Sequence, residues 1–260
     1  MKYTASPEKL VETEIPPVES RLLNDDALFV DFGKAAYGTM LLRLPPDVSS
    51  LVVHFGERLT EAGRIDRDPP GTIRYRRIEQ GTDSSNDTCR MVIPPDERNT
   101  GERAILMPGY IGEVLPFRFV EIEDGAGIDP AWVRQIAVHY PFDDSAASFV
   151  SSDSVLNAVW DICKYTIKAT TFCGVYVDGD RERIPYEGDA YINQLGHYCT
   201  DQEYALARYS HEYGPPPARS LSLPPAVRSR PASKAIPCQL RVYRPNSSDL
   251  PPGGGRSCCG

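Results

Sequence analysis

Short apolar segments separated by turn residues fill the chain from Ala27 to about Phe149. Apolar and polar side chains alternate within several of them, as in Phe117-Arg118-Phe119. A period of two is typical of antiparallel strands that keep one face in water, and a β-sandwich is the natural way to close such strands into a domain. We expect strands at 27–32, 39–44, 51–55, 72–79, 88–93, 104–107, 116–122 and 135–140.

After Phe142 the hydrophobic period lengthens. Apolar residues recur at three- and four-residue steps, which predicts a helix over about 153–170 with Ser152 or Asp153 as its N-terminal cap. Two further helices are expected at about 189–200 and 202–213, the last one capped by Asp201. Because strands give way to helices without alternating with them, the pattern indicates a domain boundary near residue 147.

These patterns divide the chain into four parts. Residues 1–26 form an N-terminal arm, residues 27–146 a β-sandwich domain, and residues 147–213 the start of a helical domain. Residues 214–260 differ from all that precedes them, because runs of proline and glycine break any regular element. We expect this last part to be a disordered tail.

The charge of the last part is also different. It holds seven basic residues and one acidic residue, a net charge of +6, whereas the whole chain carries −8 and residues 1–213 therefore −14. One interpretation is a native disordered tail. The interpretation that we favour is out-of-frame translation beyond Tyr213, which would make the chain a truncated form of a longer protein.

The bulk properties argue against several classes of protein. A net charge of −8 is not that of a general nucleic-acid binder, which would carry a basic face. No apolar run approaches the roughly 20 residues that a membrane span needs. The polar segment from Met1 to Asp26 lacks the apolar core of a signal peptide, so we expect a cytoplasmic protein. The cysteines and histidines show no metal-ligand spacing, so we expect no metal.

The densest group of ionisable residues lies between the first two predicted helices, at 177–189, and reads VDGDRERIPYEGD. Carboxylates packed together raise one another's pKa, whereas neighbouring arginines hold others ionised. Cleavage of a sugar needs that divergence, because one acid must be protonated at the leaving oxygen while other groups bind hydroxyls or activate water. The alternative interpretation is a solvated loop between helices.

The amino-acid sequence of this loop also resembles that of a known enzyme family. Residues 172–186, which read FCGVYVDGDRERIPY, resemble the acid-bearing loop of the α-L-rhamnosidases of glycoside hydrolase family 78. The resemblance continues through 188–194, and it includes 30–34 and 115–118 in the preceding sandwich, so that it covers about residues 27–213. It implies an antiparallel β-sandwich followed by the first helices of an (α/α)6 six-hairpin barrel.

The resemblance also implies a set of site residues. By position, Glu182 resembles the general acid of the family. The residues that it implies for substrate binding are Asp178, Asp180, Arg181, Tyr186 and Asp189.

Each of these substrate-binding residues has an expected role. Asp178 and Asp189 resemble carboxylates that hold rhamnose hydroxyls, and Arg181 would lie beside the acid. Tyr186 stands where many relatives have a tryptophan, and it would suit stacking on a sugar face. The spacing from Asp178 to the acid is one residue shorter than in better-known members, so Asp178 and Asp180 could exchange roles.

Two functions remain open. The first is hydrolysis of terminal α-L-rhamnosyl linkages with inversion, on a rhamnose-containing glycoside and without cofactor. The family's second carboxylate lies far downstream and nothing after Tyr213 matches it, so we expect weak or no activity from this chain alone. The second function is a non-catalytic carbohydrate-binding sandwich, which exposed aromatic side chains at Tyr75, Phe117 and Phe119 would support.

Overall fold

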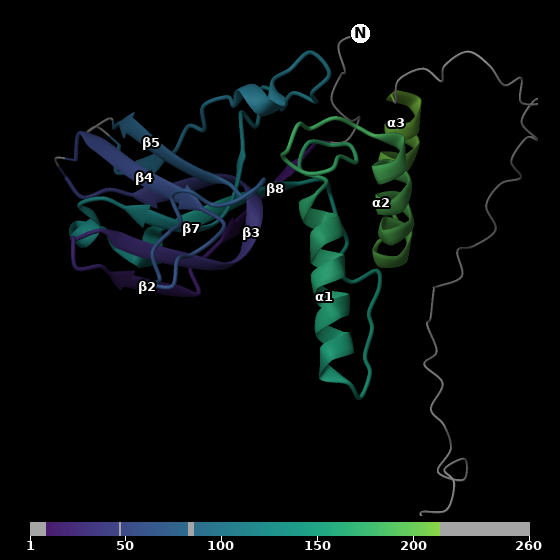
Figure 1. Cartoon of the computed structure of the whole chain (residues 1–260), viewed down its shortest axis with the longest axis horizontal. Helices are drawn as coiled ribbons and strands as arrows, with labels where there is room; N and C mark the ends of the chain where they lie inside the picture. The colour runs from purple at the N-terminus through teal and green to yellow at the C-terminus, as the bar shows by residue number, and fades with distance from the viewer. Residues whose placement is uncertain (1–8, 47, 83–85, 214–260) are drawn as a thin grey trace, which may run out of the picture.

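The computed structural model describes residues 9–46, 48–82 and 86–213. Within these residues an antiparallel sheet of eight strands is followed by three α-helices (Figure 1). The predicted order of a β-sandwich and then helices is therefore confirmed. The strands are β1 (Val11–Ile15), β2 (Glu19–Leu22), β3 (Leu28–Arg43), β4 (Ser50–Gly56), β5 (Tyr75–Gly81), β6 (Thr88–Arg90), β7 (Leu115–Ile122) and β8 (Arg134–His139). The helices are α1 (Ser154–Ala169), α2 (Glu187–Thr200) and α3 (Ala205–Tyr213).

The long strand β3 organises the sheet. Its first half pairs with β2 and β7, and its second half pairs mainly with β6 and β8. The register against β7 shifts between Asp31 and Ala36, where Gly33 adopts a φ of +82°, so the strand bends there. The bend lets the halves of β3 belong to two layers, and Val30 from one half shares a single core with Met40 from the other.

The central strand β7 departs from the expected alternation, because both of its faces are buried. Phe117 lies in the main core, where it makes edge-on contacts with two other phenylalanines. Phe119, which was expected on the same face, packs with Phe29 and Ile65 in a separate cluster. Ile65 comes from the loop that follows β4, so this loop covers a surface that the sequence pattern left open to water.

The expected strand at 104–107 is not a strand. The segment 91–114 is irregular apart from a 3₁₀ turn at Glu97–Asn99. Ala104 and Ile105 are nevertheless buried, and the backbone N–H of Ile105 donates to the carbonyl of Arg183 at 2.9 Å. The apolar character of this segment therefore reflects contact with the loop between α1 and α2, not a place in the sheet.

The N-terminal arm expected at 1–26 contributes to the sandwich where the structure describes it, from residue 9 onward. Strand β1 pairs with β8, and strand β2 pairs with the first half of β3. Most side chains of these two strands are exposed. Their lack of an apolar pattern explains why the sequence did not indicate them.

The helices begin close to the predicted positions. Asp153 caps α1, because its side chain accepts from the backbone N–H groups of Val155 and Leu156. Helix α3 begins later than expected, at Ala205, whose N–H donates to the Glu203 carboxylate at 2.5 Å. The predicted cap, Asp201, instead follows the end of α2.

Two other expectations concern parts of the chain that the structure does not test. The tail at 214–260 lies outside the described residues, and the domain boundary near residue 147 stays a prediction. Among the described helices, none combines the length and apolarity that crossing a membrane requires.

Candidate active site

The loop between α1 and α2 is anchored by a second apolar core. Phe172, Tyr176 and Val177 are almost completely buried, together with apolar side chains from β8 and α3. The ring of Phe172 stacks on Tyr37 of β3, with 3.8 Å between the ring centroids. The apolar half of the loop is therefore packed between the sandwich and α3, and it fixes the point from which the charged half begins.

Four of the predicted site residues are connected by an ion pair and hydrogen bonds on the accessible side of this loop. Arg181 Nη2 lies 2.9 Å from Asp178 Oδ2. The Nε and Nη2 groups of Arg181 donate to the two carboxylate oxygens of Glu182, each at 3.0 Å. The hydroxyl of Tyr186 donates to Glu182 Oε1 at 2.5 Å. The arrangement leaves one arginine shared between two carboxylates.

The pKa values of the two carboxylates move in opposite directions. The hydrogen bonds from Tyr186 and Arg181 hold the pKa of Glu182 below its usual value. Burial raises the pKa of Asp178, and the negative charges of Glu182 and Asp189 act in the same direction, against the opposing charge of Arg181. The two carboxylates are therefore shifted in opposite senses: burial favours the protonated form of Asp178, and the hydrogen bonds to Glu182 favour its ionised form.

The carboxylates of Asp178 and Asp189 lie in different environments. The Oδ1 atom of Asp178 is buried and has no hydrogen-bond partner among the described residues. Asp189 lies in the first turn of α2, where the positive end of the helix dipole stabilises a carboxylate. The two side chains interact through their charges.

Asp180 points away from the other predicted residues. Its carboxylate is buried, and both oxygens are occupied: Oδ1 accepts from Asn99 and Arg183, each at 2.9 Å, and Oδ2 accepts from Arg74 Nε at 2.8 Å. A carboxylate held in this way has no oxygen left for a sugar hydroxyl. The geometry therefore disagrees with the prediction that Asp180 binds substrate.

Sequence reasoning missed the residues that reach this loop from the sandwich. Arg74, immediately before β5, and Asn99 contact Asp180, and the positive charge of Arg103 contributes to lowering the pKa of Glu182. These residues lie far from the loop in the sequence, so no local spacing could reveal them. One feature of the sequence could have pointed to them. The apolar pair at 104–105 indicates that the segment carrying Asn99 and Arg103 packs against another part of the protein.

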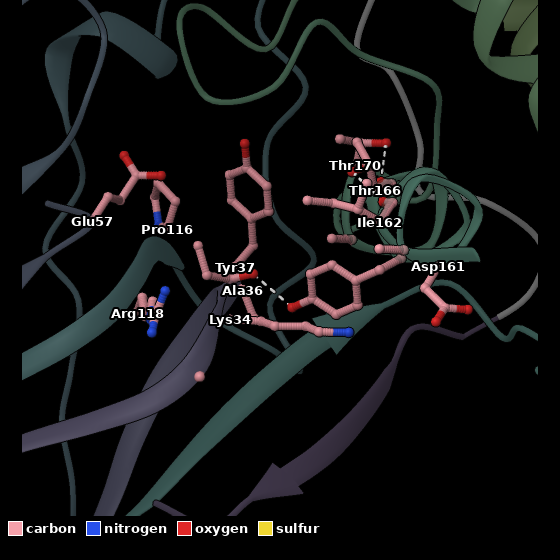
Figure 2. A pocket seen from close by; sticks show the side chains of 15 residues that line it. Lys34, Ala36, Tyr37, Glu57, Pro116, Arg118, Asp161, Ile162, Thr166 and Thr170 are labelled. Atoms are coloured by element: carbon pink, nitrogen blue, oxygen red, sulfur yellow. Dashed lines mark hydrogen bonds between the residues drawn. The ribbon is translucent and has the colours of Figure 1, made fainter. Parts of the chain in front are cut away.

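A cavity of about 620 Å³ lies between the sandwich and α1, and Figure 2 shows Lys34, Tyr37 and Glu57 on its sandwich side with Asp161 and Ile162 on its helix side. None of the six predicted site residues lines it. Within the described part of the chain, no three His, Cys, Asp or Glu side chains are grouped to hold a metal ion.

Fold and loop together define a class of protein: an antiparallel β-sandwich followed by the start of a six-hairpin helical domain, with a carboxylate-rich loop after the first helix. Residues 144–211 match the family model described as the bacterial alpha-L-rhamnosidase 6 hairpin glycosidase domain. This match confirms the resemblance to α-L-rhamnosidases for the helical part of the chain, including the whole loop between α1 and α2. No curated protein sequence matches the chain.

Several solved rhamnosidase structures are similar to this fold at low sequence identity. A rhamnosidase from Klebsiella oxytoca, solved with rhamnose bound, is 17% identical with a TM-score of 0.52, over 81% of this chain and 47% of that one. The enzyme from Dictyoglumus thermophilum is 15% identical with a TM-score of 0.58, over 79% of this chain and 21% of that one. The enzyme from Streptomyces avermitilis, complexed with L-rhamnose, is 16% identical with a TM-score of 0.57, over 79% and 18%.

These likenesses confirm the fold. The chain spans less than half the length of each of these three proteins.

Proposed function

We propose that the loop between α1 and α2 belongs to a glycosidase site that hydrolyses terminal α-L-rhamnosyl linkages with inversion, with Glu182 as the general acid. The observation that carries the proposal is the set of contacts that connects Asp178, Arg181, Glu182 and Tyr186. All four residues lie inside the segment that matches the rhamnosidase family model. The rhamnose bound in two proteins of the same fold supports rhamnose as the sugar. Carboxylates suffice for this chemistry, so the proposal needs no metal and no organic cofactor.

The proposal sets a condition on Glu182. A general acid must carry a proton, whereas the bonds from Tyr186 and Arg181 favour the ionised form of Glu182. A bound sugar must therefore displace at least the Tyr186 hydroxyl, so that the glycosidic oxygen takes its place beside Glu182. Tyr186 would then be free to stack on the sugar, while Asp178 and Asp189 hold hydroxyls.

The alternative, a non-catalytic sugar-binding sandwich, has less support. Phe117 and Phe119 are buried, and the hydroxyl of Tyr75 lies 2.8 Å from Nδ1 of His54, with which its ring is stacked. These aromatic side chains stabilise the sandwich and form no exposed platform. Measurable sugar affinity in residues 27–146 alone would favour the alternative.

Binding is the first test of the proposal. The whole chain is titrated with L-rhamnose and followed by amide NMR, with D-glucose as the control sugar. We expect rhamnose-dependent shifts at residues 177–189 and none with glucose. If rhamnose leaves the loop unperturbed, or shifts only residues of the sandwich, the proposed site is wrong.

Turnover tests the role of Glu182. In a complete barrel built on this sequence, Glu182→Gln should lower the hydrolysis of a rhamnosyl disaccharide by ~10²–10⁴-fold, because a poor leaving group depends on proton donation. Aryl rhamnosides with acidic leaving groups should lose less. Glu187→Gln, an exposed residue of the same type in the first turn of α2, is the matched control. Full disaccharide turnover in the Glu182 variant would contradict the assignment.

A further inference from the structure

A buried network of charged side chains fastens the loop between α1 and α2 to the sandwich. Asp180 lies between two arginines, Arg74 and Arg183, whose side chains are 3% and 0% exposed. The guanidinium of Arg74 donates to the Asp180 carboxylate through Nε and Nη2, at 2.8 and 2.5 Å, and to the Asp180 carbonyl at 2.8 Å. Its Nη1 donates to Asp96 at 3.1 Å.

The second arginine closes the network on the other side. Arg183 donates through Nε to Asp180 Oδ1 at 2.9 Å, and its Nη2 lies 2.5 Å from Glu113 Oε1. Asn99 donates to the same oxygen of Asp180. A buried charge is tolerated only when it is paired and hydrogen-bonded, so these groups hold one another in a single arrangement.

The network fixes the backbone on both sides of the proposed acid. On one side, the carbonyl of Asp180 is bound by Arg74. On the other side, Arg183 adopts a left-handed φ of +52°, and its carbonyl accepts from the N–H of Ile105. Only Arg181 and Glu182 lie between these two fixed points, and they are the residues that the loop turns outward. The direction of Glu182 therefore follows from contacts made beneath it.

We propose that Arg74 of the sandwich is a positioning residue for Glu182, acting through Asp180 and without touching substrate. The role of Glu182 as an acid rests on the proposed function; the mechanical link between Arg74 and the Glu182 side chain does not. Asp180 is then an anchor that carries the restraint from the sandwich into the loop. The contacts of Glu182 with Tyr186 and Arg181 depend on that restraint, because both partners lie on the same loop.

The test compares Arg74→Met with Arg77→Met, a control at an exposed arginine of the neighbouring strand β5 that pairs with Glu79. Carboxyl carbon NMR, assigned by comparison with Glu182→Gln, follows the titration of Glu182 in each folded variant. We expect Arg74→Met to raise the pKa of Glu182 toward its ordinary value of 4.5, since the loop no longer holds Tyr186 and Arg181 against it. Amide exchange over 177–186 should become at least about tenfold faster. The control should change neither quantity.

A gentler variant covers the case in which Arg74→Met does not fold. Arg74→Lys keeps a charge opposite Asp180 but loses the paired contacts with the carboxylate and the carbonyl. We expect a smaller shift of the Glu182 titration in the same direction. A titration of Glu182 and a loop exchange that match the wild type, in a folded Arg74 variant, would overturn the proposal. This outcome is independent of whether the chain binds rhamnose, which tests the proposed function separately.

Discussion

The sandwich and the helix that follows it bury their apolar side chains to very different extents. In the sandwich, Leu42 and Phe55 are completely buried. Helix α1 has no buried residue, and it leaves Leu156 and Ile162 51% and 62% exposed. Because full burial of a large apolar side chain contributes about 1.5–3 kcal/mol, the sandwich is stabilised by its own core, whereas α1 gains little from its contacts in this chain.

The loop that carries the proposed site resembles the sandwich in this respect, not the helix that precedes it. Phe172 and Tyr176 are as deeply buried as the core of the sheet, and the nearby Asp180 is bound by Arg74. The sequence places the loop with the helices, but its stabilising contacts come from the sandwich as well as from α2 and α3. The loop is thus better anchored than α1, the helix that precedes it.

The largest expected effect contrasts the same substitution in the two regions. Leu42→Ala should lower the free energy of unfolding by about 2–5 kcal/mol, because it leaves a cavity in the core. Leu156→Ala on α1 should change it by less than about 0.5 kcal/mol, because that side chain is half exposed. Urea unfolding of both variants measures the difference. Equal losses would mean that α1 is buried in solution and that the contrast between the regions is wrong.

A second, smaller effect concerns a buried carboxylate of the sandwich. Burial alone would raise the pKa of Glu121, but hydrogen bonds from Arg64 and from the N–H of Ile65 outweigh it and hold the pKa below its ordinary value of 4.5. A carboxylate with a lowered pKa in the folded state stabilises the fold above that ordinary value, and the contribution is lost as the pH falls through the folded pKa.

Glu121→Gln should therefore cost about 1.5–3 kcal/mol near neutral pH. The difference from the wild type should shrink in acid below the ordinary pKa of 4.5. Urea unfolding at several pH values measures this, and Glu79→Gln, whose side chain is 60% exposed, serves as the control. A difference that stays constant with pH would show that the carboxylate charge is not what stabilises this position.

The smallest effect tests whether α1 is coupled to the sandwich at all. Asp153→Ala removes the N-terminal cap of α1, which is commonly worth about 1 kcal/mol. Amide exchange in the first turn of α1 should quicken by about fivefold, while the unfolding midpoint of the sandwich stays unchanged. A lowered midpoint would indicate that α1 and the sandwich unfold together.

Much of the fold could be predicted from local patterns, and the exceptions have a common cause. The change of hydrophobic period located the helices, and Asp153 was recognisable as a cap. Strands β1 and β2 were missed because they are edge strands with exposed side chains, and 104–107 was mistaken for a strand because its apolar residues face a loop. In each case a partner distant in the sequence decided the structure, and no local pattern records such a partner.

The site shows the same limit at the scale of single residues. The amino-acid sequence of the loop was sufficient to predict Asp178, Arg181, Glu182 and Tyr186 as members of one site, and the structure connects them. It was not sufficient to separate Asp180 from them, because whether a loop carboxylate faces outward or inward depends on what lies beneath it. Arg74 lies beneath it, and it comes from the sandwich, 106 residues earlier in the sequence.

Because residues of the sandwich hold the loop in place, the two parts cannot be recombined freely during evolution. If recombination joined these helices to an unrelated sandwich, Arg181, Glu182 and Tyr186 would travel with them, but Arg74 and Asn99 would be left behind. Asp180 and Arg183 would then be buried against a surface that offers them no matching charge. Such a chimera would still encode Glu182 but would lose the contacts that fix the direction of its side chain. Selection for activity would accordingly be expected to keep sandwich and helices together as one heritable unit, even though each looks separable on its own.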